Sequence, residues 1–176
     1  SSEFSRQKAL IIGGTRGLGE ATAKIIAAGG GYPTVTYHSG EDDAKRVLSD
    51  ILDHGGQGQT IQLDVLNPGP ALRALAADGW KPTDLYYFAS PQIFGRARDS
   101  YESSRLDQFV SYYVHGLSEV CTTVLSYSDS QLNLFYPSSV AIDENSPGLT
   151  DYISAKTAGE DLARDLADRD DRLSVV

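Results

Sequence analysis

A glycine-rich turn between a short apolar run and a helical segment constrains the fold of this chain more than any other feature. Residues 8–12 (KALII) form the apolar run, which is typical of a strand buried on both faces. The turn follows at residues 13–19 (GGTRGLG), and residues 20–28 predict a helix with Ala21, Ile25 and Ala28 on one face. Glycines in such a turn let the backbone bend tightly and approach a pyrophosphate, whose charge meets the free N–H groups of the helix. The order of strand, turn and helix therefore favours nucleotide binding over a purely structural turn.

The same alternation of strand-like and helical patterns continues to the end of the chain. Consecutive units of this kind predict a parallel sheet with right-handed crossovers and helices on both faces. We therefore expect an α/β, doubly wound Rossmann fold with strand order 3-2-1-4-5-6 and a ligand site at the carboxyl ends of the strands. The further strands are expected at residues 33–37, 60–63, 84–88, 132–136 and 173–176, and the further helices at residues 41–54, 70–78, 102–127 and 150–167.

Composition narrows the classes of function. The net charge of -9 argues against a nucleic-acid partner, because phosphate binding needs a basic surface. Cys121 is the single cysteine and cannot form an internal disulfide, which favours a reducing, cytoplasmic setting. No apolar run approaches the roughly 20 residues that span a bilayer. We expect no metal site and no membrane contact.

The chain length of 176 residues fits one domain. Residues 1–7 are interpreted as a tag or flexible N-terminus, and residues 8–176 as the NAD(P)-binding Rossmann domain. The sequence contains no methionine, and its last residues resemble the start of a strand. We therefore expect a fragment of a longer protein, with a domain that is incomplete at its C-terminal end.

The end of the second expected strand bears on the cofactor. NAD sites place an acidic residue there to accept a hydrogen bond from the ribose 2′-hydroxyl. This chain has Tyr37, His38 and Ser39 at that position, with no acid before Glu41. Ser39, His38 and the arginine of the glycine turn could hold a 2′-phosphate, so NADP(H) is favoured over NAD(H). An ordinary exposed loop position remains the alternative for His38.

Tyr152 and Lys156 lie four residues apart in the last expected helix, on one helical face. An ammonium beside a phenol favours its phenolate form, as a proton donor to a carbonyl oxygen requires. Such a pair also arises by chance, so its position relative to other motifs matters. Ser138 and Ser139 follow the fifth expected strand, at the edge of the sheet where ligands bind. A serine hydroxyl there can hydrogen-bond a substrate oxygen.

These motifs together resemble the short-chain dehydrogenase/reductase family, in its classical branch, and in particular its ketoreductases. The glycines follow the pattern Gly-x-x-x-Gly-x-Gly, and Ser139 precedes Tyr152 by the thirteen residues that classical members show. The resemblance implies Ser139 as the residue that orients the substrate oxygen, Tyr152 as general acid, and Lys156 as the residue that binds the nicotinamide ribose and tunes Tyr152. Hydride would come from C4 of the nicotinamide. Ser138 is the less favoured candidate for the role given to Ser139, and its hydroxyl is interpreted as a structural turn group.

The resemblance also implies a set of cofactor-binding residues. Asp64, after the third strand, would bind the adenine amino group, with a turn or helix-capping role as the alternative. The full set is Gly13, Thr15, Arg16, Gly17, Leu18, Gly19, His38, Ser39, Asp64, Val65, Ala89, Ser90, Tyr152 and Lys156.

Three positions depart from the family pattern. Ile12 stands where the first motif has threonine, and residues 87–90 read Tyr-Phe-Ala-Ser where the family has Asn-Asn-Ala-Gly. Tyr113, three residues before Gly116, stands where the family has an asparagine. The departures at residues 87–90 and at Tyr113 favour one alternative function, a nucleotide-binding module of a larger protein that has lost catalysis.

A second alternative is an extended-type relative that acts on nucleotide sugars. Glu160, four residues after Lys156, favours it, whereas Arg16 stands where that branch has glycine. The leading hypothesis is an NADP(H)-dependent oxidoreductase acting on a small-molecule carbonyl or alcohol. The expected helix 102–127 carries Phe109, Tyr112, Tyr113 and Leu117, which suit either a contact between copies of the chain or a core face.

Overall fold

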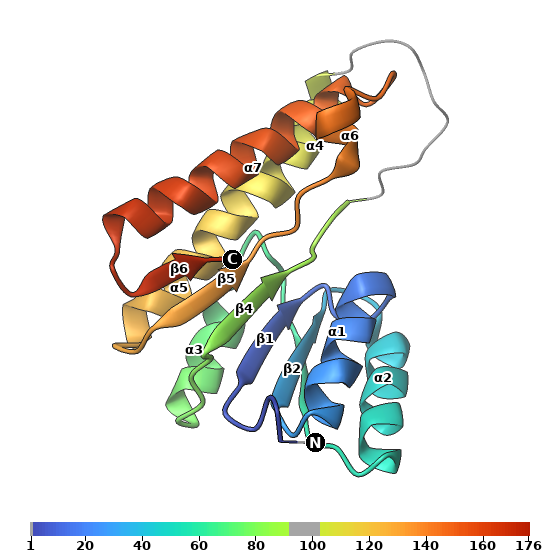
Figure 1. Ribbon diagram of the computed structural model, residues 1–176, viewed down its shortest axis with the longest axis vertical. Helices are drawn as coiled ribbons and strands as arrows, with labels where there is room; N and C mark the ends of the chain where they lie inside the picture. The colour runs from blue at the N-terminus through green and yellow to red at the C-terminus, as the bar shows by residue number, and fades with distance from the viewer. Residues whose placement is uncertain (1, 92–102) are drawn as a thin grey trace.

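The computed structural model describes residues 2–91 and 103–176, in which six parallel strands form one sheet (Figure 1). The strand order is β3-β2-β1-β4-β5-β6, which confirms the predicted fold class and order. Adjacent strands pair in register, for example Leu10 with Thr34 of β2 and with Leu85 of β4. The strands are β1 (Lys8–Ile12), β2 (Tyr32–Tyr37), β3 (Gln59–Gln62), β4 (Asp84–Tyr87), β5 (Leu132–Phe135) and β6 (Leu173–Val175).

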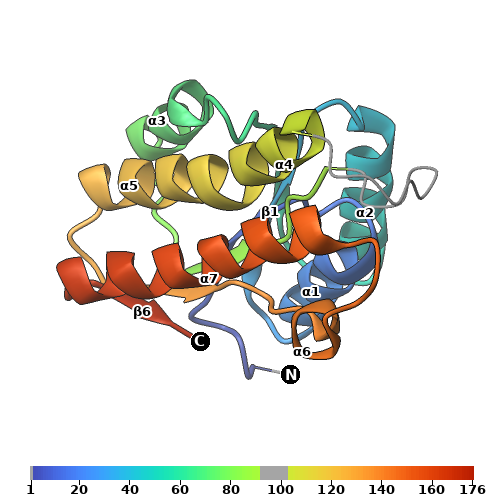
Figure 2. The same cartoon turned by 90° about the horizontal axis from the view of Figure 1, so that it is seen from above.

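Helices cover both faces of the sheet, and two hydrophobic clusters fill the space beneath them. Because side chains alternate along a strand, β1 supplies Ala9 and Ile11 to one cluster and Leu10 and Ile12 to the other. Figure 2 shows α1 and α2 apart from the group of α3, α5 and α7. The helices are α1 (Gly17–Ala28), α2 (Glu41–Asp53), α3 (Gly69–Ala77), α4 (Ser103–Val110), the π-helix η1 (Ser111–Gly116), α5 (Leu117–Tyr127), α6 (Val140–Glu144) and α7 (Thr150–Arg169).

The buried face of α1 differs from the predicted one. Gly19, Ala23, Ile26 and Ala27 are buried, whereas Ile25 is 60% exposed. A Cβ atom on Gly19 would collide with the carbonyl oxygen of the glycine turn, so this first helical turn lies directly against the turn backbone. That close approach fixes the rotation of α1 about its axis, and positions four, seven and eight residues later then face the sheet. The predicted face of Ala21, Ile25 and Ala28 was therefore wrong.

The long helix predicted at residues 102–127 is continuous from Ser103 to Tyr127, but its middle section is a π-helix. Glu102 lies outside the described residues. Phe109, Tyr113 and Leu117 are buried within the chain, so they form a core face here. Contact between copies through this helix stays a prediction. No helix within residues 2–91 and 103–176 has the length and apolar character needed to cross a membrane.

The segment before β1 contacts the folded domain. The backbone N–H of Phe4 donates to the Gly29 carbonyl over 2.9 Å, and the Phe4 side chain packs against the cluster beneath α1 and α2. Gln7 donates to Asp84 at the start of β4 over 3.5 Å. The interpretation of residues 1–7 as a tag or flexible terminus stays a prediction.

Candidate active site

The glycine turn after β1 is held against β2 by two hydrogen bonds that its backbone N–H groups donate to Thr36. The N–H of Gly13 donates to the Thr36 hydroxyl over 3.1 Å, and the N–H of Gly14 donates to the Thr36 carbonyl over 3.3 Å. Gly13 has a φ of +76°, and a Cβ atom there would lie 3.0 Å from the backbone of Phe88. The turn can therefore lie this close to the end of β4 only with glycine at position 13.

Gly17 differs from the other glycines of this turn because it faces open space. Its φ is +54°, and a Cβ atom there would have no neighbour within 4 Å. Gly17 is also the first residue of α1, whose first N–H groups have no intrahelical acceptor. The turn therefore forms a backbone cradle with room for a phosphate at a helix N-terminus, and the residues present fit a dinucleotide.

Two adjoining cavities lie at the carboxyl ends of the strands, one on each side of this turn. The first, of about 320 Å³, extends from the turn toward the ends of β2 and β3. The second, of about 280 Å³, extends toward β5 and α7. Both are lined by Gly13, Arg16, Phe88, Ala89 and Ser90, so together they form one continuous site across the point where the strand order reverses.

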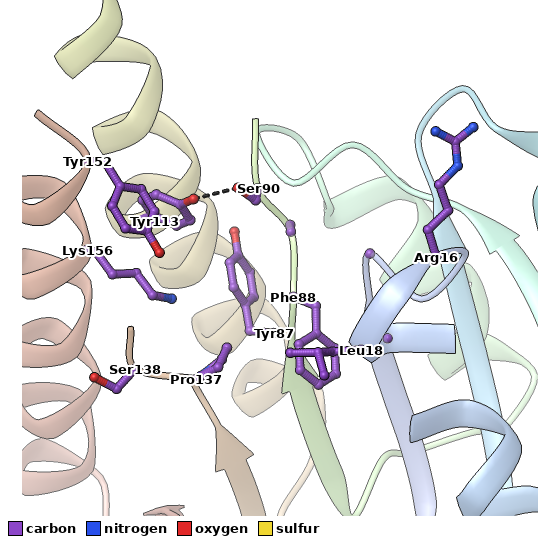
Figure 3. Close-up of a pocket in the computed structure, with 13 residues that line it drawn as sticks. Arg16, Leu18, Tyr87, Phe88, Ser90, Tyr113, Pro137, Ser138, Tyr152 and Lys156 are labelled. Carbon is purple, nitrogen blue, oxygen red and sulfur yellow. Dashed lines mark hydrogen bonds between the residues drawn. The ribbon is translucent and has the colours of Figure 1, made fainter. Parts of the chain in front are cut away.

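Tyr152 and Lys156 reach the second cavity from the N-terminal part of α7, as Figure 3 shows. Both are buried, at 8% and 4% exposed. The Tyr152 ring is held edge-on against Phe109 and Tyr113, each with a centroid separation of 5.7 Å. The helical spacing predicted from the sequence therefore places both side chains at one cavity.

The Lys156 ammonium lies over two aromatic rings. Its Nζ atom is 3.7 Å from the centroid of the Tyr136 ring and 4.9 Å from that of the Tyr113 ring. Burial lowers the pKa of Lys156 to about 8, and the nearby Glu160 carboxylate opposes this shift. The ring faces stabilise the ammonium by cation–π attraction, which partly offsets the loss of water.

The two main departures from the family pattern contact one another. The hydroxyl groups of Ser90, after β4, and Tyr113, in η1, are hydrogen-bonded over 2.5 Å (Figure 3). Beside them, the Tyr87 hydroxyl donates to the Tyr112 carbonyl over 2.6 Å. Burial raises the pKa of Tyr113 to about 12, so this hydroxyl is protonated at neutral pH. Residues that replace the family's asparagines and glycine thus form a connected wall of the second cavity.

The two serines after β5 have different surroundings. Ser138 lines the second cavity. Ser139 is the N-cap of α6, a helix absent from the predicted elements, and its hydroxyl accepts from the Ala141 N–H over 3.3 Å. Ser139 is not among the residues that line the two cavities. Its predicted role toward the substrate oxygen stays a prediction.

At the other end of the site, His38 and Asp64 line the first cavity. Their roles in nucleotide binding stay predictions. Asp64 also has the turn role that was its alternative, because its carboxylate accepts from the Leu66 N–H over 2.9 Å. Ser39 is exposed and lies outside the cavity lining. The Arg16 guanidinium is paired with Asp43 of α2, an acidic residue that lies beyond the end of β2 in the sequence.

The structure brings most of the predicted site residues to the two cavities. Thr15, Gly17, Ser39 and Ser139 do not line them, although Thr15 and Gly17 belong to the glycine turn. Sequence reasoning did not assign Tyr112, Tyr113 and Pro137 to the site, and it named Ser138 only as the less favoured serine. The departure of Tyr113 from the family pattern was the available signal. The predicted residues on the lining are Gly13, Arg16, Leu18, Gly19, His38, Asp64, Val65, Ala89, Ser90, Tyr152 and Lys156.

Comparison with known proteins gives a family match over nearly the whole chain. The family model described as short chain dehydrogenase matches residues 7–175. Over 60 residues the chain is 38% identical to 1-cyclohexenylcarbonyl-CoA reductase of Streptomyces collinus, a stretch that covers 34% of this chain and 21% of that relative. Over 168 residues it is 26% identical to the uncharacterized oxidoreductase YgfF of Escherichia coli, covering 90% of this chain and 68% of YgfF.

Among solved structures, FolM alternative dihydrofolate reductase 1 from Brucella suis, in complex with NADP, superposes with a TM-score of 0.84. The match covers 98% of this chain and 71% of that one, at 18% sequence identity. At this identity the likeness shows the fold. The shared fold includes the sheet edge on which the glycine turn and the two cavities lie.

Proposed function

The chain belongs to the short-chain dehydrogenase family of oxidoreductases, and we propose that it transfers hydride between NADP(H) and a small-molecule carbonyl or alcohol, with Tyr152 as the proton donor. One observation carries this proposal. Tyr152 and Lys156 line the same cavity as Gly13 and Gly19 of the glycine turn, which supports a proton donor next to the proposed dinucleotide site. Packing alone does not require a phenol and an ammonium at the same cavity as a phosphate cradle.

The chain's own residues would divide the chemistry between them. When bound, NADPH supplies a hydride to the carbonyl carbon. Tyr152 gives its hydroxyl proton to the carbonyl oxygen, and Lys156 stabilises the phenolate that remains. Lys156 would also bind the ribose hydroxyls next to the nicotinamide. In the oxidative direction Tyr152 takes the proton back from the alcohol.

Ser139 is proposed to orient the substrate oxygen and share its developing charge. Its position thirteen residues before Tyr152 supports this role. The present bond of its hydroxyl to the Ala141 N–H is long, at 3.3 Å, and therefore weak enough to exchange for a substrate oxygen. Ser138, on the cavity lining, is the neighbouring hydroxyl against which this role must be tested.

The preference for NADP(H) over NAD(H) rests on the residues around the first cavity. Arg16 and His38 line this cavity, and Ser39 follows directly on the chain. A guanidinium suits a 2′-phosphate because it donates several hydrogen bonds in one plane. The NADP complex of the Brucella suis protein supports the same choice.

The proposal is tested by incubating the full-length protein with NADPH and a panel of ketones, and following loss of NADPH absorbance. Tyr152→Phe should abolish turnover while the affinity for NADPH, measured by fluorescence, changes little. Tyr86→Phe is the matched control, because it also removes a phenol hydroxyl. The Tyr86 ring packs against the hydrophobic cluster under α1 and α2 instead of lining the two cavities. Binding of NADPH without turnover of any ketone would contradict the enzyme proposal.

A second candidate, a nucleotide-binding module without turnover, is favoured by the bond between Ser90 and Tyr113. A tyrosine and a serine there replace the family's asparagine and glycine, and both line the cavity that the nicotinamide would enter. The ketone panel separates the two candidates, since the module would bind NADPH and leave every ketone unreduced.

A further inference from the structure

An ion pair joins the glycine turn to α2 at the edge of the first cavity. The Nε and Nη2 atoms of Arg16 both donate to Oδ2 of Asp43, over 2.9 and 2.5 Å. In Figure 3 the Arg16 side chain lies on the opposite side of the view from Tyr152. Arg16 lines both cavities and is the residue proposed to bind the 2′-phosphate. Because of its pair with Asp43, this guanidinium already has an anionic partner.

Asp43 lies beside the first cavity through its pair with Arg16, although it is not among the residues that line that cavity. It belongs to the first turn of α2, which begins at Glu41, four residues after β2 ends at Tyr37. In doubly wound folds, the end of this strand is where the ribose 2′ position is recognised. A 2′-phosphate and the Asp43 carboxylate would therefore compete for the same donors of Arg16.

We propose that Asp43 is a specificity-determining residue that weakens the binding of NADP(H) by holding Arg16 and by repelling the 2′-phosphate. The inference rests on the proposed NADP(H) function. The sequence has no acidic residue directly at the end of β2. In this proposal the carboxylate that acts on the 2′ position comes instead from Asp43, in the helix that follows. NAD(H) has no 2′-phosphate, so its binding does not require Arg16 to leave Asp43.

The exposure of the pair sets the size of the effect. The side chains of Arg16 and Asp43 are 79% and 30% exposed, and ion pairs in water contribute little to stability. Removing the carboxylate should therefore tighten NADPH binding by about two- to fivefold, as expected for an exposed charge contact. The affinity for NADH should change less than about twofold.

The test measures dissociation constants of NADPH and NADH by fluorescence or calorimetry, using the full-length protein at low ionic strength. Asp43→Asn should lower the dissociation constant of NADPH and leave that of NADH nearly unchanged. Asp42→Asn is the matched control, because it removes the same charge from the same helical turn, and no contact of Arg16 found within the described residues involves Asp42. Thermal melting confirms that each variant is folded.

Arg16→Ala should weaken the binding of NADPH. In the Arg16→Ala background, Asp43→Asn should change the NADPH affinity less than it does in the wild-type chain, because the partner of Asp43 is gone.

Equal NADPH affinities of wild type and Asp43→Asn would overturn the inference. So would equal tightening by Asp42→Asn, which would indicate a general charge effect. Weaker NADH binding by Asp43→Asn would also overturn it, and would instead identify Asp43 as a ribose ligand. A wild-type chain that binds NADH more tightly than NADPH would contradict the proposed function itself, which is a separate outcome.

Discussion

Replacing Lys156 with methionine should stabilise the fold at neutral pH and lose that advantage as the pH rises. Lys156 is 4% exposed, and burial lowers its pKa from 10.5 to about 8. A difference of one pKa unit corresponds to about 1.4 kcal/mol, so keeping this ammonium charged in the folded state costs about 3 kcal/mol at pH 7. Methionine has a similar length and carries no charge, so it avoids most of this cost.

The sign of the pH dependence follows from the two pKa values. Between pH 8 and 10.5 the unfolded chain binds the lysine proton more tightly than the folded chain does, so the wild type gains stability as the pH rises through this window. The advantage of Lys156→Met should therefore fall from about 3 kcal/mol at pH 7 to less than half of that at about pH 9.5.

Urea unfolding of both proteins, followed by circular dichroism at several pH values from 7 to 9.5, measures this difference. Other titrating groups are shared by wild type and variant and cancel in the comparison. A difference in unfolding free energy that stays constant over this pH range would refute the reasoning, because Lys156 would then titrate alike in both states.

Three further variants test the site. Tyr113→Phe removes the hydroxyl bonded to Ser90 and should lower the unfolding free energy by about 1 kcal/mol, measured by urea unfolding; an unchanged value would mean that the bond contributes nothing. Gly159→Ala should lower the unfolding free energy by about 1–3 kcal/mol in the same assay, because the new Cβ atom would lie 2.7 Å from the Tyr113 carbonyl oxygen. An unchanged unfolding free energy would show that α7 and η1 separate easily. Ser139→Ala should lower kcat by about 10²-fold or more, whereas Ser138→Ala should change it by less than about tenfold; the reverse order would transfer the proposed role to Ser138.

The sequence predicted the architecture because strand and helix patterns alternate strictly along the chain. It did not predict which face of α1 is buried. Apolar residues occur on several sides of this helix, and the close contact of Gly19 with the glycine turn decides between them. The short helix α6 was also missed, since five residues carry little periodic signal.

Within the site, the glycine turn and the Tyr152–Lys156 pair were predictable because each is a local pattern. Contacts between distant segments were not. Ser90 and Tyr113 were each recognised as departures from the family pattern, but their shared hydrogen bond joins positions 23 residues apart. The pairing of Arg16 with Asp43 spans 27 residues and was equally invisible.

Transfer of deuterium from NADPH labelled at C4 of the nicotinamide tests the central claim most directly. The full-length protein would be incubated with labelled NADPH and the best ketone of the panel, and the mass of the product would be measured. We predict an alcohol that carries one deuterium from the labelled cofactor, and no such product from Tyr152→Phe, although that variant still binds NADPH. An alcohol without deuterium, or equal deuterated product from Tyr152→Phe, would contradict the account.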